Sequence, residues 1–218
     1  MKPDNIGEVL RYLGHRGQQV EPEMLSRIKA ATAECRSIAH PRQIWQRFKL
    51  AQEGCSLRLS GTSLTLANND TCNYLPGACE LAVIAVTLGT EIEAYIARKQ
   101  YSDITYALML DAAATQLVEE TCNNVESAIR VQITAENLYI GTRFSPGYGS
   151  LPLQLSSALL ELLDAPRRIG LSCTPNHTLT PRKSVTAFVG IFSNAIQPQA
   201  RSCANCPAQQ GCGFSRAE

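Results

Sequence analysis

The sequence predicts an α+β fold, a single domain in which a largely antiparallel, twisted sheet is flanked by helices. Helical and strand-like segments are mixed along the chain without the regular β-α-β alternation that is typical of parallel sheets. There is no internal repeat, low-complexity stretch or interdomain linker. With 218 residues, the chain is long enough to bury a sizeable core.

The first part of the chain, residues 1–52, is predicted to be helical. Residues 5–14 place apolar side chains at helical spacing and end at Gly14. Residues 21–38 form a second predicted helix, with Pro22 near its first turn.

The middle of the chain combines a hairpin with a buried segment. "SLRLSGTSLTLA", residues 56–67, alternates apolar and polar residues around a Ser-Gly turn, which indicates a β-hairpin. Residues 75–100 follow a Pro-Gly turn and fit a buried helix, or a strand and then a helix. A short apolar run does not separate these two alternatives.

The second half begins with the longest predicted helix, residues 103–130, which no Pro or Gly interrupts. Its predicted apolar stripe comprises Ile104, Leu108, Val118, Cys122, Val125 and Ile129. A strand is expected over 135–144, a helix over 151–166 opened by Pro152, and strands over 168–174 and 184–193.

Composition excludes several function classes. A net charge of +1 provides no excess of cations for non-specific nucleic-acid binding. The N-terminus has no apolar signal-peptide region, and the longest apolar run, "LAVIAVTLG", is far shorter than the ~20 residues of a membrane span. We expect a soluble, cytoplasmic protein with no membrane partner, in which the nine cysteines are reduced.

The stretch "RFSPGYGSLP", residues 143–152, is a candidate ligand-binding turn. Arg143 could hold a carboxylate through two parallel hydrogen bonds. Gly147 and Gly149 would let the backbone approach a ligand closely around Ser145, and Tyr148 could pack on adenine or near a sulfonium. These groups match S-adenosylmethionine. The alternative is an ordinary surface turn, since Ser, Pro and Gly are typical of loops.

The ammonium of such a ligand requires an acid. Asp111, Thr115 and Glu119 lie at i, i+4 and i+8 along one side of the predicted helix 103–130. Asp111 and Glu119 are therefore candidate ligands. The alternative is that these acids pair with bases such as Arg130 or Arg143 for structural reasons.

With these residues, the chain resembles the activation domain of cobalamin-dependent methionine synthase. Arg143, Gly147, Tyr148 and Pro152 match that family's Arg-x-x-x-Gly-Tyr-x-x-x-Pro signature. Residues 161–190 resemble the segment that follows it, and "QLVEE" resembles the helix with the acidic ligand residue, which favours Glu119. Residues 8–17 and 85–96 resemble short stand-alone members, so that the resemblance covers roughly residues 5–195. The family's Cys-Pro-Asp-His run after Gly-Tyr is absent, as is a cobalamin-binding Asp-x-His-x-x-Gly motif.

The resemblance implies an activation-domain-like fold over residues 1–196 and a function that needs a partner. The domain would bind S-adenosylmethionine through Arg143, Ser145, Gly147, Tyr148, Glu119 and Asp111. It would then support reductive remethylation of cob(II)alamin on a separate methionine synthase, with electrons from a flavodoxin or ferredoxin. No proton moves in this methyl transfer, so no catalytic side chain is expected. The alternatives are a reductive activator of another corrinoid methyltransferase and a non-catalytic S-adenosylmethionine sensor.

A Cys-rich tail, residues 197–218, is an addition to the family pattern. Cys203, Cys206 and Cys212 have the spacing C-x2-C-x5-C, which fits an iron–sulfur cluster or a zinc knuckle. Cys173 would supply a fourth ligand if the tail folded back. A flexible reduced tail is the alternative.

Overall fold

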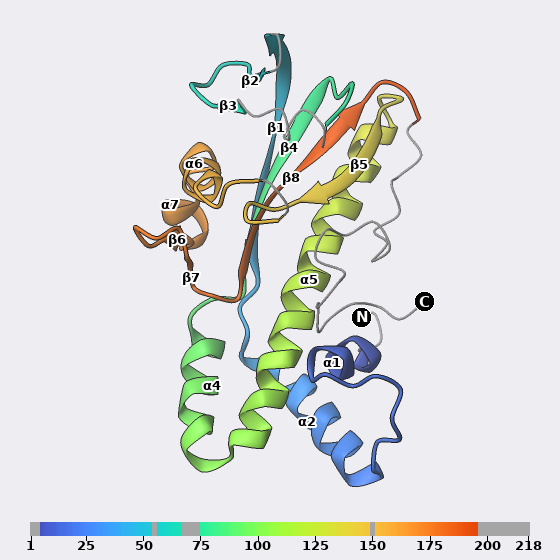
Figure 1. The fold of residues 1–218 in the computed structure, drawn as a ribbon, viewed down its shortest axis with the longest axis vertical. Coiled ribbons are helices and arrows are strands. Elements are labelled where there is room, and N and C mark those ends of the chain that lie inside the picture. Colours follow the sequence, from blue (N-terminus) through green and yellow to red (C-terminus); the bar gives the residue numbers. More distant parts are fainter. Residues whose placement is uncertain (1–4, 54–55, 67–74, 149–150, 196–218) are drawn as a thin grey trace.

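The computed structural model contains a six-stranded antiparallel sheet in the order β3-β2-β1-β4-β8-β5, together with a separate pair, β6-β7 (Figure 1). It describes residues 5–53, 56–66, 75–148 and 151–195. The strands are β1 (Arg42–Glu53), β2 (Ser56–Leu59), β3 (Thr65–Leu66), β4 (Glu80–Thr87), β5 (Tyr139–Phe144), β6 (Ser172–Cys173), β7 (Leu179–Thr180) and β8 (Ser184–Phe192). The predicted antiparallel α+β architecture is confirmed.

Helices cover both faces of this sheet. They are α1 (Ile6–Tyr12), α2 (Pro22–Ile38), α4 (Glu91–Ser102), α5 (Ile104–Thr134), α6 (Leu155–Leu162) and α7 (Ala165–Ile169). Helix α5 packs on one face of the sheet, and α6 and α7 pack on the other (Figure 1). The segment 75–100 is thus a strand followed by a helix.

Strand β4 shows why that segment reads as one apolar run. Ala82, Ile84 and Val86 belong to the core beneath α5. The residues between them, Leu81, Val83 and Ala85, belong to the core beneath α6 and α7. Because successive strand side chains alternate between faces, a strand covered on both sides is apolar throughout.

At one end of the molecule, α1, α2 and α4 pack around the N-terminal half of α5 (Figure 1). Asp103 caps α5, since its side chain accepts a 2.9 Å hydrogen bond from the N–H of Tyr106. The predicted apolar stripe is wrong at its start, because Ile104 and Leu108 are 66% and 58% exposed. The neighbouring Met109 and Leu110 are buried in their place.

The remaining differences from the predictions have local causes. Strand β1 occupies the end of the range expected to be helical, and its alternation is obscured because Arg47 is only 21% exposed, held by ion pairs with Glu80 of β4 and with Glu136. The strand expected over 168–174 is confirmed only at Ser172–Cys173, which form β6; the two residues at its start belong to α7, which is capped by Gly170 with φ +69°. Helix α6 begins at Leu155, three residues after Pro152. None of the helices in the described ranges is long and apolar enough to cross a membrane.

Candidate functional site

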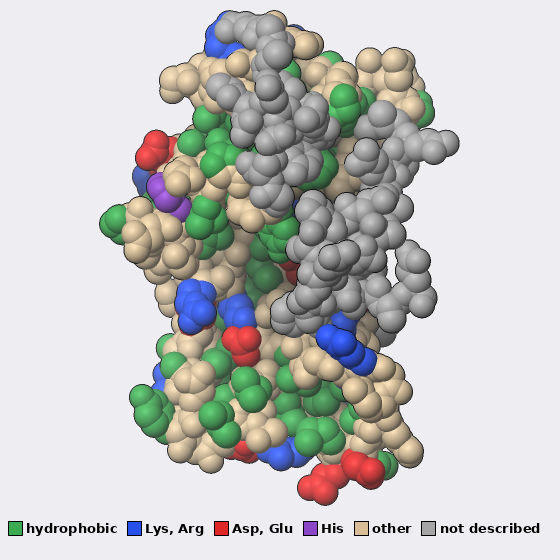
Figure 2. Space-filling model, in the orientation of Figure 1, with side chains coloured by type: hydrophobic (Ala, Val, Ile, Leu, Met, Phe, Trp, Pro, Cys, Tyr) green, Lys and Arg blue, Asp and Glu red, His purple; other side chains and the backbone are tan. Residues whose placement is uncertain are grey.

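A pocket of about 370 Å³ lies where the turn after β5, helix α5, the start of α6 and the β6–β8 segment meet. Its volume falls in the range of small-molecule sites, roughly 300–1,000 Å³. Figure 2 shows a hollow near the middle of this face, with basic and acidic side chains at its border. The lining residues include Glu119, Ser145, Pro146, Tyr148, Leu153, Ser156, His177, Thr178, Leu179, Arg182, Ser184, Val185 and Thr186.

The turn predicted to bind a ligand forms one wall of this pocket. The N–H of Gly147 donates to the carbonyl of Leu151 at 2.9 Å, and the N–H of Tyr148 donates to that of Ser145 at 3.2 Å. Gly147 has φ +88°, where a side chain would be strained, and an added Cβ would lie 3.2 Å from Cδ1 of Leu153. Ser145 and Tyr148 line the pocket, and Tyr148 is 73% exposed. Gly149 lies outside the described residues.

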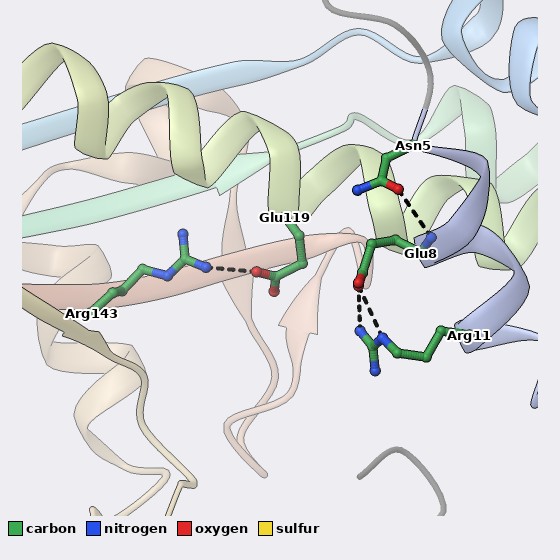
Figure 3. Close-up of polar contacts among 5 residues, drawn as sticks. All are labelled: Asn5, Glu8, Arg11, Glu119 and Arg143. Atoms are coloured by element: carbon green, nitrogen blue, oxygen red, sulfur yellow. Dashed lines mark hydrogen bonds and ion pairs between the residues drawn. The ribbon is translucent and has the colours of Figure 1, made fainter. Parts of the chain in front are cut away.

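Arg143 is not among the residues that line the pocket and lies between two acids of α5. Its Nη2 donates to Oε2 of Glu119 at 2.6 Å (Figure 3). Its Nη1 lies 2.8 Å from Oε1 of Glu126, an ion-pair contact without the alignment of a hydrogen bond. The Arg143 side chain is only 5% exposed, whereas that of Glu119 is 39% exposed. The guanidinium expected to meet a ligand carboxylate thus lies within ion-pair distance of two acids, and its role in ligand binding stays a prediction.

A β-bulge sets this arrangement. The pairing of β5 with β8 shifts register between Ile140 and Arg143. Such a bulge re-aims the side chains that follow it. Glu119 and Glu126 are seven residues apart, two helical turns, and so present their carboxylates on one face of α5.

Asp111 does not join this site. Its Oδ1 lies 2.8 Å from Nζ of Lys183, which also donates to Oγ1 of Thr115 at 2.9 Å. Asp111 precedes Glu119 by eight residues, which is about 12 Å along the helix. It is 52% exposed, so the apolar setting suggested by its sequence neighbours is not its environment. A role for Asp111 in ligand binding stays a prediction.

Helix α1 lies on the other side of Glu119. Asn5 caps the helix by accepting from the N–H of Glu8, and Glu8 in turn accepts from Arg11 (Figure 3). The Arg11 guanidinium stacks 4.3 Å from the ring centre of Tyr12. Burial, and next the charge of Glu119, raise the pKa of Tyr12. The acid of the pocket therefore lies close to the N-terminal helix.

The β6–β7 hairpin contributes groups that the sequence did not reveal. His177, with φ +59°, lines the pocket, and its Nδ1 lies 2.7 Å from Oγ of Ser157. That hydroxyl is also 3.1 Å from Sγ of Cys173. Histidine is among the residues that tolerate positive φ, but nothing in a single sequence connects residue 157 with residue 177.

The predicted metal ligands remain untested. Cys203, Cys206 and Cys212 lie outside the described residues. Cys173 is half-buried next to Ser157, and the described ranges contain no group of three His, Cys, Asp or Glu side chains that could hold a metal ion.

Comparisons with known proteins agree with the resemblance. The family described as vitamin B12 dependent methionine synthase, activation domain, matches residues 75–200. Among solved structures, the fold is similar to the MetH reactivation domain bound to AdoHcy, with a TM-score of 0.64, 16% identity, and coverage of 88% of this chain and 78% of that chain. No curated protein matches.

Proposed function

Because the chain belongs to the family of the vitamin B12 dependent methionine synthase activation domain, we propose that it binds S-adenosylmethionine in the pocket beside Glu119 and Tyr148. S-adenosylhomocysteine, the ligand of the structurally similar MetH reactivation domain, is what S-adenosylmethionine becomes after methyl transfer. The single observation that carries the proposal is the position of the signature turn, which lines a ligand-sized pocket together with a partly exposed acid.

Each part of the pocket suits one part of the ligand. Glu119 offers a carboxylate to the ammonium or sulfonium, because an opposite charge at a partly desolvated site stabilises both. Tyr148 presents an exposed ring at the pocket mouth, suited to adenine or to a cation–π contact. Arg143 belongs to the site as the residue that holds Glu119 in place.

The proposed activity requires a second protein. An electron reduces the cob(II)alamin of a separate methionine synthase, and the methyl group of S-adenosylmethionine then passes to the cobalt, leaving S-adenosylhomocysteine. This chain would supply the position of the methyl donor. The main contribution of such a module is to hold the methyl donor next to the cobalt, which raises the effective concentration of one reactant at the other. The electron would come from a flavodoxin or ferredoxin, or from a metal site in the tail.

Calorimetric titration with S-adenosylmethionine tests the binding step. We expect Glu119→Gln to weaken binding about tenfold or more, because a charge-assisted contact with the cationic ligand is lost. Glu136→Gln is the matched control, since Glu136 also pairs with an arginine but does not line the pocket. If the wild type, Glu119→Gln and Glu136→Gln bind S-adenosylmethionine with equal affinity, the assignment of Glu119 is wrong.

A transfer assay separates the module from a sensor. The chain is mixed with a methionine synthase that lacks its activation domain, an electron donor and methyl-labelled S-adenosylmethionine, and label on the corrinoid is measured. Labelling supports the reactivation module. Binding without labelling of either methionine synthase or another corrinoid methyltransferase would favour a sensor.

A further inference from the structure

One wall of the pocket is the segment 177–186, which we call the wall segment and which includes His177 and Thr186. It begins in the β6–β7 hairpin, which is paired at two positions, and it ends in β8 of the sheet. The connection between β7 and β8, residues 181–183, passes next to α4 and α5 (Figure 1). The position of this wall relative to Glu119 therefore depends on what ties the connection to the two helices.

Lys183 provides these ties through its backbone and its side chain. Its N–H donates to Oε1 of Glu93 in α4 at 2.6 Å, and its carbonyl accepts from the N–H of Leu88 at 3.0 Å. Its Nζ lies 2.8 Å from Oδ1 of Asp111, and it donates to Oγ1 of Thr115 at 2.9 Å and to the carbonyl of Asp111 at 3.2 Å. An ammonium has three N–H donors, so these oxygens of α5 match its full capacity.

The contacts of the Lys183 side chain lie on the same side of α5 as the pocket acid. Asp111, Thr115 and Glu119 follow one another at intervals of four residues, each about 6 Å along the helix. Lys183 is not among the residues that line the pocket, and its side chain is 17% exposed. It therefore fastens the wall segment to α5 about one helical turn before Glu119.

We infer that Lys183 is a positioning residue that sets the wall segment against Glu119, and that Asp111 serves the site by holding Lys183. This inference rests on the proposed function. A pocket wall that must be ordered when the ligand binds lowers affinity, whereas a wall already held in place does not. Residues that do not contact a ligand can change its affinity about two- to thirtyfold in this way.

The experiment is a double-mutant cycle on the affinity for S-adenosylmethionine, measured by calorimetric titration. Lys183→Met removes the cation and keeps the length of the side chain, Asp111→Asn removes the acid, and a third variant carries both changes. We expect each single change to weaken binding about fivefold. The double variant should bind no worse than the weaker single variant, because both changes break the same contact. If Asp111 contacted the ligand itself, its loss would add to that of Lys183→Met.

Two further variants separate positioning from a general effect on stability. Arg27→Met is the matched control, because Arg27 pairs with Asp103 at the start of α5 and does not line the pocket; it should bind as the wild type does. Lys183→Arg restores a cation opposite Asp111 and should bind within about twofold of the wild type. Urea denaturation of every variant verifies that the affinities are compared between folded proteins.

Hydrogen exchange measured without ligand covers the case in which Lys183→Met does not fold. Asp111 is 52% exposed, so Asp111→Asn should fold. The backbone amides of residues 177–186 should exchange faster in Asp111→Asn than in the wild type, because the tie to α5 is weakened. Unchanged exchange in this segment would overturn the inference.

The titrations have three outcomes that contradict the inference while the wild type still binds and the proposed function stands. Lys183→Met may bind as tightly as the wild type, the losses of the two single variants may add, or Lys183→Arg may fail to restore binding. If the wild type itself does not bind S-adenosylmethionine, the proposed function fails and the inference fails with it.

Discussion

At the scale of the residue, the central feature is a buried cation between two acids. Arg143 joins Glu119 at the pocket to Glu126, whose side chain is 15% exposed. Removing one partner of a buried ion pair leaves an uncompensated charge, which costs more than the intact pair contributes. Arg143 therefore affects folding as well as the position of the pocket acid.

We predict that Arg143→Ala lowers the free energy of unfolding by about 3 kcal/mol, measured by urea denaturation monitored by circular dichroism. Arg143→Lys keeps a positive charge but lacks the two-pronged geometry, so its loss should be smaller. Glu119→Gln removes only the acid on the pocket side. It should lower the free energy of unfolding by less than Arg143→Ala does, because Glu119 is partly solvated and Glu126 still pairs with Arg143. A stability of Arg143→Ala equal to that of the wild type would contradict the structural role.

At the scale of the element, helix α5 connects the two halves of the molecule. Its 31 residues pack against α1, α2 and α4 at one end and against the sheet at the other. It also carries Glu119, so the start of the helix influences where the pocket acid lies. Asp103 fixes that start, since it caps α5 and lies 2.6 Å from Nη2 of Arg27.

This cap should make stability depend on pH in the acid range. The hydrogen bond from the N–H of Tyr106, together with the charge of Arg27, lowers the pKa of Asp103 below its usual 3.8. The resulting stabilisation is present above pH 3.8 and is lost as pH falls through the lower pKa of the folded state. We therefore expect the thermal midpoint of the wild type to fall more steeply below pH 4 than that of Asp103→Asn, which can still cap the helix.

Differential scanning calorimetry between pH 7 and pH 3 measures this difference. Asp103→Ala is the second variant; it should have a lower midpoint than the wild type at pH 7, because an alanine cannot accept the N–H of Tyr106. Parallel pH profiles for the wild type and Asp103→Asn would show that Asp103 does not titrate as described.

At the scale of the whole molecule, the pocket exists only because distant segments meet. Its walls come from α5, the turn after β5, α6, the β6–β7 hairpin and the segment into β8. Residues 197–218, the Cys-rich tail, lie outside the described residues.

The metal prediction can be tested on the full chain. We expect protein purified without oxygen to contain iron or zinc by mass spectrometry, and replacement of Cys203, Cys206 and Cys212 by serine to remove it. Wild-type protein without metal would favour the reduced-tail alternative. An absorption band in the visible spectrum of the purified wild-type protein would identify an iron–sulfur cluster rather than zinc.

The sequence by itself determined the local structure and the family signature. The helical spacing at residues 5–14, 21–38 and 103–130 arises from which face of each helix is buried. The structure confirms these helices and the strand expected over 184–193, which is β8. Strand β1 was not predicted, because the charged Arg47 is mostly buried there by ion pairs with Glu80 and Glu136, residues remote in sequence. The signature turn and Glu119 were found because their residue types and the resemblance point to them.

Only the tertiary structure decided which of the candidate residues share a site. Glu119 and Asp111 look equivalent on one helix face, yet their separation along α5 gives one to the pocket and the other to Lys183. Arg143 was predicted either to bind a ligand carboxylate or to pair with an acid, and the fold places it between Glu119 and Glu126. His177 of the β6–β7 hairpin and Arg182 of the segment leading into β8 line the pocket with Glu119, although both are remote from it in sequence. Contacts between distant segments depend on how the elements pack, and the periodicity of a single sequence reports only which face of each element is buried.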